Sequence, residues 1–138
     1  MSQSTISVLE HNEQNALLIS PTADDYDILG RLFRRCGWAL RYATSIRSAS
    51  AQLNEYPASV VITERDLPIG NWRDVLDLAQ GFPEPPSVIV MSRQADDYLW
   101  AEALNLGAYD VLTKPLNDTE VFRGLTLAWA HQQKYPAA

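Results

Sequence analysis

The side chains best suited to chemistry in this sequence follow short apolar runs at three points of the chain. Glu64 follows the run 60–63, Ser92 follows 88–91, and Lys114 follows 110–113. Short β-branched runs bounded by turn residues are typical of buried parallel strands. Because the carboxyl ends of parallel strands meet at one edge of the sheet, these groups are expected to gather there. A carboxylate, a hydroxyl and an ammonium group together can bind a phosphate-bearing ligand or take part in phosphoryl transfer.

The elements that must position these side chains alternate along the chain. Strands are predicted at 16–19, 38–43, 60–63, 88–91 and 110–113, and helices at 22–36, 45–55, 71–79, 95–106 and from 117 onward. Strands that alternate with helices and are joined by short loops form a parallel sheet covered on both faces. Right-handed crossovers then favour an α/β fold, a doubly wound five-stranded parallel sheet of order 2-1-3-4-5.

The length and composition fit one globular domain. We predict a flexible N-terminal tail at 1–15, the domain at 16–133 and a C-terminal tail at 134–138. The net charge of -6 and the scattered Lys and Arg residues predict no binding to nucleic acid. No apolar run is long enough for a membrane helix, and the N-terminus has no signal-peptide pattern. The single cysteine, Cys36, reads as a core residue, and a cytoplasmic location is expected.

Four segments in order resemble the receiver domain of bacterial two-component response regulators, which accepts a phosphoryl group from histidine kinases. They are 64–68, 88–92, 103–108 and 111–115, and the resemblance extends over about residues 17–132. The family has a chemotaxis-regulator-like, flavodoxin-like fold. The resemblance therefore implies the same strand order and a role in signal transduction.

The resemblance assigns family site positions to three residues that keep the family's chemistry. Lys114 stands at the position of the site lysine, which contacts the phosphoryl group. Pro115 stands at the proline whose preceding peptide bond is usually cis. Ser92 stands at the switch position, where a Thr or Ser hydroxyl follows the phosphoryl oxygen.

Four other positions depart from the family pattern. Glu64 replaces the phosphoacceptor aspartate, Ser20 and Pro21 replace the acidic pair that helps to hold Mg²⁺, and Val111 replaces the switch aromatic. Mg²⁺ is bound mainly through carboxylates, carbonyl groups and water, so we expect weak or absent Mg²⁺ binding and no other metal or cofactor. The extra methylene of Glu64 moves its carboxylate about 1.5 Å outward, toward Lys114 and Ser92. These departures indicate a pseudo-receiver with a fixed Glu64–Lys114 pair and no enzymatic activity.

Other acids near the predicted site have simpler interpretations. Thr22 and Asp25 match a capping box, and Asp24 and Asp25 suit the first turn of a helix, so we assign them to capping rather than to the site. The alternative is that they turn into the site and restore metal binding. Asp66 is an alternative phosphoacceptor only if its loop rearranges. Glu64 and Lys114 also have a plainer interpretation, as solvated surface residues.

Three functions remain open from the sequence. The first is a stand-alone receiver-like domain in a phosphorelay that acts by protein–protein interaction with a signalling or output protein, or as a homodimer. The predicted interface is the face of the fourth helix, fifth strand and fifth helix, with Tyr98, Trp100, Tyr109 and Trp129 as candidate anchors. The second is a receiver still phosphorylated at a non-standard residue. The third is a small enzyme of this topology that binds a phosphate-bearing ligand.

Overall fold

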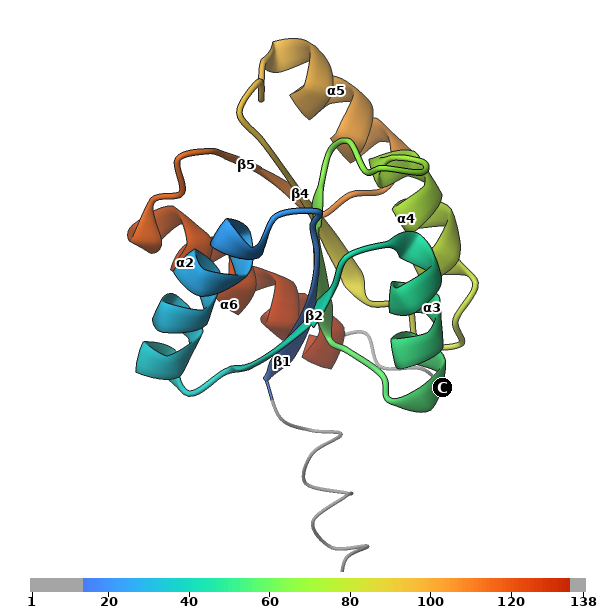
Figure 1. The fold of residues 1–138 in the computed structure, drawn as a ribbon, viewed down its shortest axis with the longest axis horizontal. Coiled ribbons are helices and arrows are strands. Elements are labelled where there is room, and N and C mark those ends of the chain that lie inside the picture. Colours follow the sequence, from blue (N-terminus) through green and yellow to red (C-terminus); the bar gives the residue numbers. More distant parts are fainter. Residues whose placement is uncertain (1–13, 135–138) are drawn as a thin grey trace, which may run out of the picture.

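Five parallel strands and five helices alternate in the computed structural model, which describes residues 14–134 (Figure 1). The elements are β1 (Asn15–Ile19), α2 (Ala23–Cys36), β2 (Ala39–Ala43), α3 (Ile46–Glu55), β3 (Val60–Glu64), α4 (Trp72–Gln80), β4 (Ser87–Ser92), α5 (Asp97–Leu106), β5 (Asp110–Thr113) and α6 (Asp118–Lys134). The strand order is β2-β1-β3-β4-β5, all in parallel register. The predicted fold class and strand order are confirmed.

Several predicted boundaries shift by one or two residues. The first strand begins at Asn15 rather than at residue 16, and the second begins at Ala39 rather than at Trp38. The Trp38 ring packs edge-on against Phe33 at 6.0 Å between centroids, because this large side chain gains more from the core than from strand pairing. The last helix, α6, is predicted to start near Asn117 and begins at Asp118. The predicted tails fall almost wholly outside the described residues.

The sheet separates two apolar cores, one on each face. In Figure 1, α2 and α6 cover one face, and α3, α4 and α5 cover the other. Strand side chains alternate between the cores: Leu18 and Ile62 pack with α2 and α6, while Leu17 and Val61 pack with α3 and α4. Burial of both sheet faces explains why the central strands read as continuous apolar runs.

Local capping signals fix the helix ends. Gly37 ends α2 in the left-handed region, with φ 75°, and donates its N–H to the Phe33 carbonyl. Asn71 caps α4: its side chain accepts from the Arg73 N–H at 2.8 Å, and the Asp74 carboxylate accepts from the Asn71 N–H at 2.9 Å. The helix predicted from residue 95 begins instead at Asp97, because the Asp96 side chain caps it.

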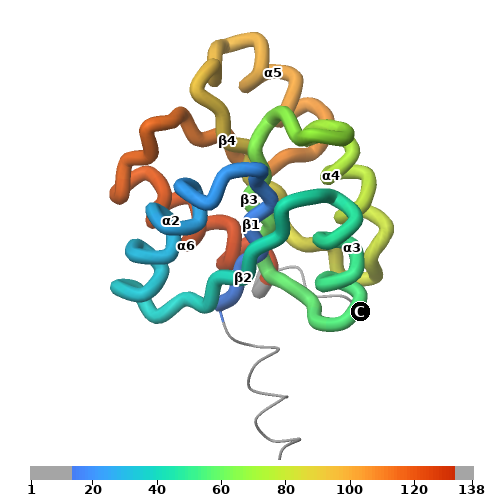
Figure 2. Tube along the Cα trace, viewed as in Figure 1, coloured from blue at the N-terminus to red at the C-terminus, as the bar shows by residue number. Residues whose placement is uncertain are grey.

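The parallel arrangement brings the carboxyl ends of β1, β3, β4 and β5 to one edge of the sheet. Figure 2 traces the chain from β1 into α2 and from β3 into α4 at this edge. Ser20, Glu64, Ser92 and Lys114 lie at these strand ends. The edge is therefore where a site can be built.

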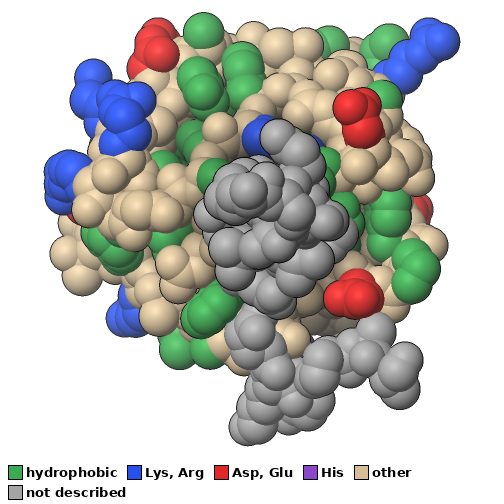
Figure 3. All heavy atoms as spheres, turned by 90° about the horizontal axis from the view of Figure 1, so that it is seen from below, with side chains coloured by type: hydrophobic (Ala, Val, Ile, Leu, Met, Phe, Trp, Pro, Cys, Tyr) green, Lys and Arg blue, Asp and Glu red, His purple; other side chains and the backbone are tan. Residues whose placement is uncertain are grey.

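On the face seen in Figure 3, basic side chains are interspersed with apolar and acidic ones and form no continuous basic surface. Within residues 14–134, no helix is long and apolar enough to cross a membrane.

The Asn71 cap yields a stability prediction. Replacement Asn71→Ala should lower the free energy of unfolding by about 1 kcal/mol, because the first turn of α4 loses its side-chain acceptor. Urea unfolding followed by circular dichroism measures the change. The control Asn105→Ala, at an exposed position inside α5, should stay within about 0.5 kcal/mol of the unmodified protein. Equal effects of the two variants would contradict the capping assignment.

Candidate functional site

The site is organised around the Lys114 ammonium group, which lies just after β5. Its Nζ donates to Glu64 Oε1 at 2.6 Å and lies 2.9 Å from Asp25 Oδ1 and 3.0 Å from Asp25 Oδ2. The three side chains are 10%, 17% and 5% exposed, respectively. The structure therefore contains the predicted Glu64–Lys114 pair, and the assignment of these two residues as solvated surface groups is wrong.

The capping box predicted from Thr22 and Asp25 does not form, because the Asp25 carboxylate is bonded to Lys114 instead. Thr22 occupies the N-cap position, but its side chain makes no capping hydrogen bond. Its hydroxyl instead donates to Asp25 Oδ2 at 3.0 Å, and the Ser20 hydroxyl donates to the same oxygen at 2.6 Å. An ammonium group is a stronger partner for a carboxylate than a backbone N–H, so Asp25 turns toward Lys114. Asp24 stays exposed, as expected of a first-turn acid.

The sequence does contain a signal for the buried position of Asp25. Asp25, Leu29 and Leu32 recur at the spacing of one helix face, and all three are buried. Asp24 shares its side of α2 with the exposed Ile28 and Arg31. An acid on the apolar stripe of a helix needs an internal partner, and this rule would have separated Asp25 from Asp24.

Glu64 is held at both carboxylate oxygens. Oε1 accepts from Lys114, and Oε2 accepts from the backbone N–H of Arg65 at 3.1 Å. The carboxylate thus connects the end of β3 to the lysine that follows β5.

The other predicted positions lie around this cluster. Ser92 is buried, and its Oγ accepts from the Gln94 N–H at 3.0 Å. The peptide bond between Lys114 and Pro115 is cis. Val111 is buried in the core under α3, α4 and α5. Ser20 is buried beside Asp25, whereas Pro21 is exposed.

The two charged partners of this cluster have shifted pKa values. Burial on its own raises the pKa of the Asp25 carboxyl, but the hydrogen bonds from Ser20 and Lys114 outweigh it and hold the pKa below its usual value. Burial lowers the pKa of Lys114, and its bonds to Glu64 and Asp25 outweigh this effect and raise it. The contribution of Asp25 to stability is therefore present above the pKa that Asp25 has in the unfolded chain. The contribution of Lys114 is present below the pKa that Lys114 has in the unfolded chain. Both contributions are present in the neutral range.

The cluster borders an open hollow of about 870 Å³, formed by α2 and the loops after β3, β4 and β5.

The side chains of this cluster fit a Mg²⁺ ion poorly. Both buried carboxylates are bonded to Lys114, and no group of three or more His, Cys, Asp or Glu side chains is arranged to hold a metal ion in the described part of the chain. Mg²⁺ requires oxygen ligands that are free to complete an octahedron.

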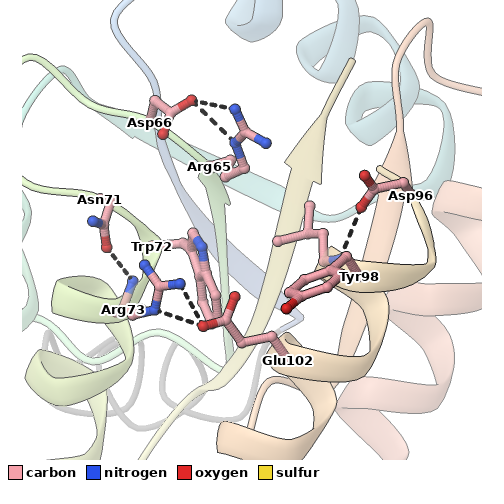
Figure 4. Close-up of a pocket in the computed structure, with 9 residues that line it drawn as sticks. Arg65, Asp66, Asn71, Trp72, Arg73, Asp96, Tyr98 and Glu102 are labelled. Atoms are coloured by element: carbon pink, nitrogen blue, oxygen red, sulfur yellow. Dashed lines mark hydrogen bonds and ion pairs between the residues drawn. The ribbon is translucent and has the colours of Figure 1, made fainter. Parts of the chain in front are cut away.

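A second hollow, of about 310 Å³, lies between the first turns of α4 and α5 (Figure 4). Arg73 stacks over the Trp72 ring at 4.9 Å and donates from Nε to Glu102 at 3.1 Å, which links α4 to α5. Tyr98 lines the hollow and is 84% exposed. The hollow therefore has one exposed aromatic side chain beside an ion pair.

Comparison with known proteins decides the family. The model of the response regulator receiver domain matches residues 21–125. The chain belongs to this family. It is thus a receiver domain of the two-component response regulator type, a class of signalling domain.

Individual relatives support the same assignment. The response regulator protein PilR of Pseudomonas aeruginosa is 27% identical over 107 residues, which are 77% of this chain and 24% of PilR. The chain thus spans about a quarter of the length of this curated relative. The receiver domain of an HD domain-containing protein from Pseudomonas fluorescens Pf-5 superposes with a TM-score of 0.80 at 26% identity, covering 89% of this chain and 99% of that one.

More distant structures show the fold alone. Chemotaxis response regulator CheY4 of Vibrio cholerae has a TM-score of 0.75 at 14% identity, covering 84% of this chain and 98% of its own. The beryllofluoride-activated NtrC4 receiver domain dimer has a TM-score of 0.79 at 19% identity, and the match covers 86% of this chain and 98% of the NtrC4 chain.

The buried Asp25 carboxylate yields a stability prediction with a defined pH dependence. Replacement Asp25→Asn should lower the free energy of unfolding at pH 7 by about 2 kcal/mol, the scale of hydrogen bonds to charged groups. Because the folded pKa of Asp25 lies below the unfolded value of 3.8, its contribution is lost as pH falls through the folded pKa. The difference between variant and unmodified protein should therefore shrink from about pH 5 to about pH 2.

Urea unfolding at each pH measures this difference. Asp24→Asn is the matched control and should change stability by less than about 0.5 kcal/mol, since Asp24 is exposed. A destabilisation by Asp25→Asn that does not vary with pH would contradict the ionic role of this carboxylate.

Proposed function

We propose that this domain signals through protein contacts while its site is held in one arrangement by the Glu64–Lys114 pair, without phosphorylation at the usual position. The observation that carries the proposal is the 2.6 Å contact between Lys114 Nζ and Glu64 Oε1. It places a carboxylate on the lysine that contacts the phosphoryl group in the family. In this proposal the Glu64 side chain takes the place of a phosphoryl group beside the lysine.

The surroundings of Glu64 support this proposal. An acceptor carboxylate must lie in line with the donor phosphorus, and catalysis of that transfer is mostly positioning and charge neutralisation. Glu64 has both oxygens bonded within the protein, and Lys114 is shared with Asp25. These contacts support the proposal because they engage both the carboxylate at the acceptor position and the site lysine.

The two other functions suggested by the sequence have less support. Asp66, the alternative acceptor, is 71% exposed and accepts from Arg65 Nη2 at 2.9 Å. Asp66 borders the same hollow as Lys114, but its ion pair is with Arg65 and not with the lysine. For a phosphate-binding enzyme, Glu64 and Lys114 do border the open hollow, but with Ser20 and Asp25 they are bonded to one another in one internal network.

We propose the face of α5, β5 and α6 as the contact surface. Tyr98, Leu104 and Leu106 of α5 and Leu127 of α6 are exposed at 45% or more. The four predicted aromatic anchors differ in exposure. Tyr98 is exposed, while Trp100, Tyr109 and Trp129 are partly buried and pack against the two cores. Tyr98 and the leucines therefore carry the proposal. That a receiver relative of similar fold forms a dimer agrees with it.

The phosphorylation part of the proposal is tested by intact mass. Incubation of the purified chain with acetyl phosphate and Mg²⁺ should add no phosphoryl group, because Glu64 is already bonded to Lys114 and Arg65. The Glu64→Asp variant should also gain none, since Asp25 still holds Lys114. A receiver domain with the full set of family acids serves as the positive control. An adduct on the unmodified chain would overturn the proposal, and peptide mapping at Asp66 would then identify the alternative acceptor.

The contact surface is tested by sedimentation velocity over a range of concentrations. If the chain self-associates through this face, Tyr98→Ala and Leu127→Asp should each weaken association by about tenfold or more, as expected for an interface anchor. Ile28→Ala, at a 43% exposed apolar position on α2, is the matched control and should have no effect. A chain that is monomeric at every concentration would contradict the homodimer, and the same variants would then be tested on the partner protein.

A further inference from the structure

Three carboxylate oxygen atoms, from the Glu64 and Asp25 side chains, form a cage around Lys114 Nζ. Three contacts reach the ammonium group: one from Glu64 and two from the Asp25 carboxylate, at 2.6, 2.9 and 3.0 Å. We propose that the Lys114 ammonium serves as the fixed cation of this site in place of a divalent metal, and that Asp25 is the positioning residue that holds it there. This inference deepens the proposed function and rests on it only for the identity of the site.

The number of contacts matches what the lysine can give. An ammonium group carries three N–H donors and no acceptor, so two carboxylates on one side can satisfy it completely. The side chain of Lys114 is 10% exposed, which leaves little of it for water. A buried cation needs such pairing to offset its lost hydration.

Asp25 reaches the cage from a different element than the family's acids do. The acid positions after β1 hold Ser20 and Pro21, whereas Asp25 lies in the first turn of α2. The hydroxyls of Ser20 and Thr22 both donate to Asp25 Oδ2, at 2.6 and 3.0 Å. Ser20 therefore cannot replace the missing carboxylate but orients the one that α2 supplies.

The charge balance opposes a second cation. Glu64 and Asp25 contribute two negative charges and Lys114 one positive charge, so a divalent ion at the cage would have to displace or repel the ammonium. If Lys114 is removed, two carboxylates and two hydroxyls remain close together with no internal cation. Oxygen ligands of this kind bind hard divalent cations. The lysine thus excludes a metal that the remaining side chains would attract.

The experiment is Mn²⁺ titration followed by electron paramagnetic resonance, in the absence of any phosphodonor. Mn²⁺ is the probe because the signal of the free ion falls when the ion binds. The unmodified chain should bind Mn²⁺ weakly, and Lys114→Met should bind it about tenfold or more tightly. Lys114→Gln is the second variant, since its neutral amide keeps hydrogen-bond donors on a side chain one bond shorter, should the methionine variant fail to fold.

Two further variants test the role of Asp25. Adding Asp25→Asn to Lys114→Met should abolish the gain, and adding Asp24→Asn should leave most of it, because Asp24 is exposed outside the cage. Thermal unfolding establishes that each variant is folded. A merely structural role of Asp25 would alter stability without separating these two double variants in Mn²⁺ affinity.

The outcomes are distinguishable from failure of the proposed function. Tight Mn²⁺ binding by the unmodified chain, or no gain in either Lys114 variant, would overturn the inference even if acetyl phosphate adds nothing. A phosphoryl adduct on the unmodified chain would overturn the proposed function without bearing on the Mn²⁺ affinities measured in its absence.

Discussion

The ion pairs of Lys114 join parts of the chain that are far apart in sequence. Lys114 follows β5, Glu64 ends β3, and Asp25 belongs to the first turn of α2. Removing one partner of a buried ion pair costs more than the pair contributes, because the remaining charge is left without compensation. The cluster therefore fixes the relative positions of α2, the β3–α4 loop and the β5–α6 loop at the edge of the sheet. The apolar cores below it are independent of this constraint and determine the fold.

Much of the fold follows from the sequence because its signals are local and agree with one another. The apolar runs, Gly37, the Asn71 cap and the short connections each predict the same alternation, and crossover handedness limits the strand order. Glu64 and Lys114 were predictable as a pair because both directly follow strands whose ends must meet. Boundaries were less predictable where a side chain such as Trp38 gains more from the core than from the strand ladder.

The site was predicted only in part, because two rules compete at Asp25. The capping pattern and the helix dipole both account for an acid at this position. Lys114 is a stronger partner for the Asp25 carboxylate, but it lies far away in the sequence, so no local pattern indicates the contact. The aromatic side chains show a similar limit. Their spacing in the sequence does not tell whether Trp100 and Trp129 are surface anchors or core residues. In the structure both are partly buried and pack against the cores. Burial on a helix face is decided by tertiary contacts.

The function proposed for this site differs physically from that of a phosphorylated switch. A switch needs two states whose populations shift when a ligand or modification binds one of them better. In the proposed function the negative charge beside Lys114 belongs to the Glu64 side chain, so one state is favoured without phosphorylation. Regulation of such a domain would come from the availability of its partner or from the pH range over which the ion pairs hold.

The most direct test of this account is the nuclear magnetic resonance spectrum of the lysine side chains in ¹⁵N-lysine-labelled protein. The sequence contains two lysines, Lys114 and Lys134, so the two ammonium signals can be assigned with one variant. The account predicts a Lys114 ammonium signal with slow proton exchange and hydrogen-bond couplings to the carboxylates of Glu64 and Asp25. Fast exchange and a shift equal to that of a free lysine would contradict it.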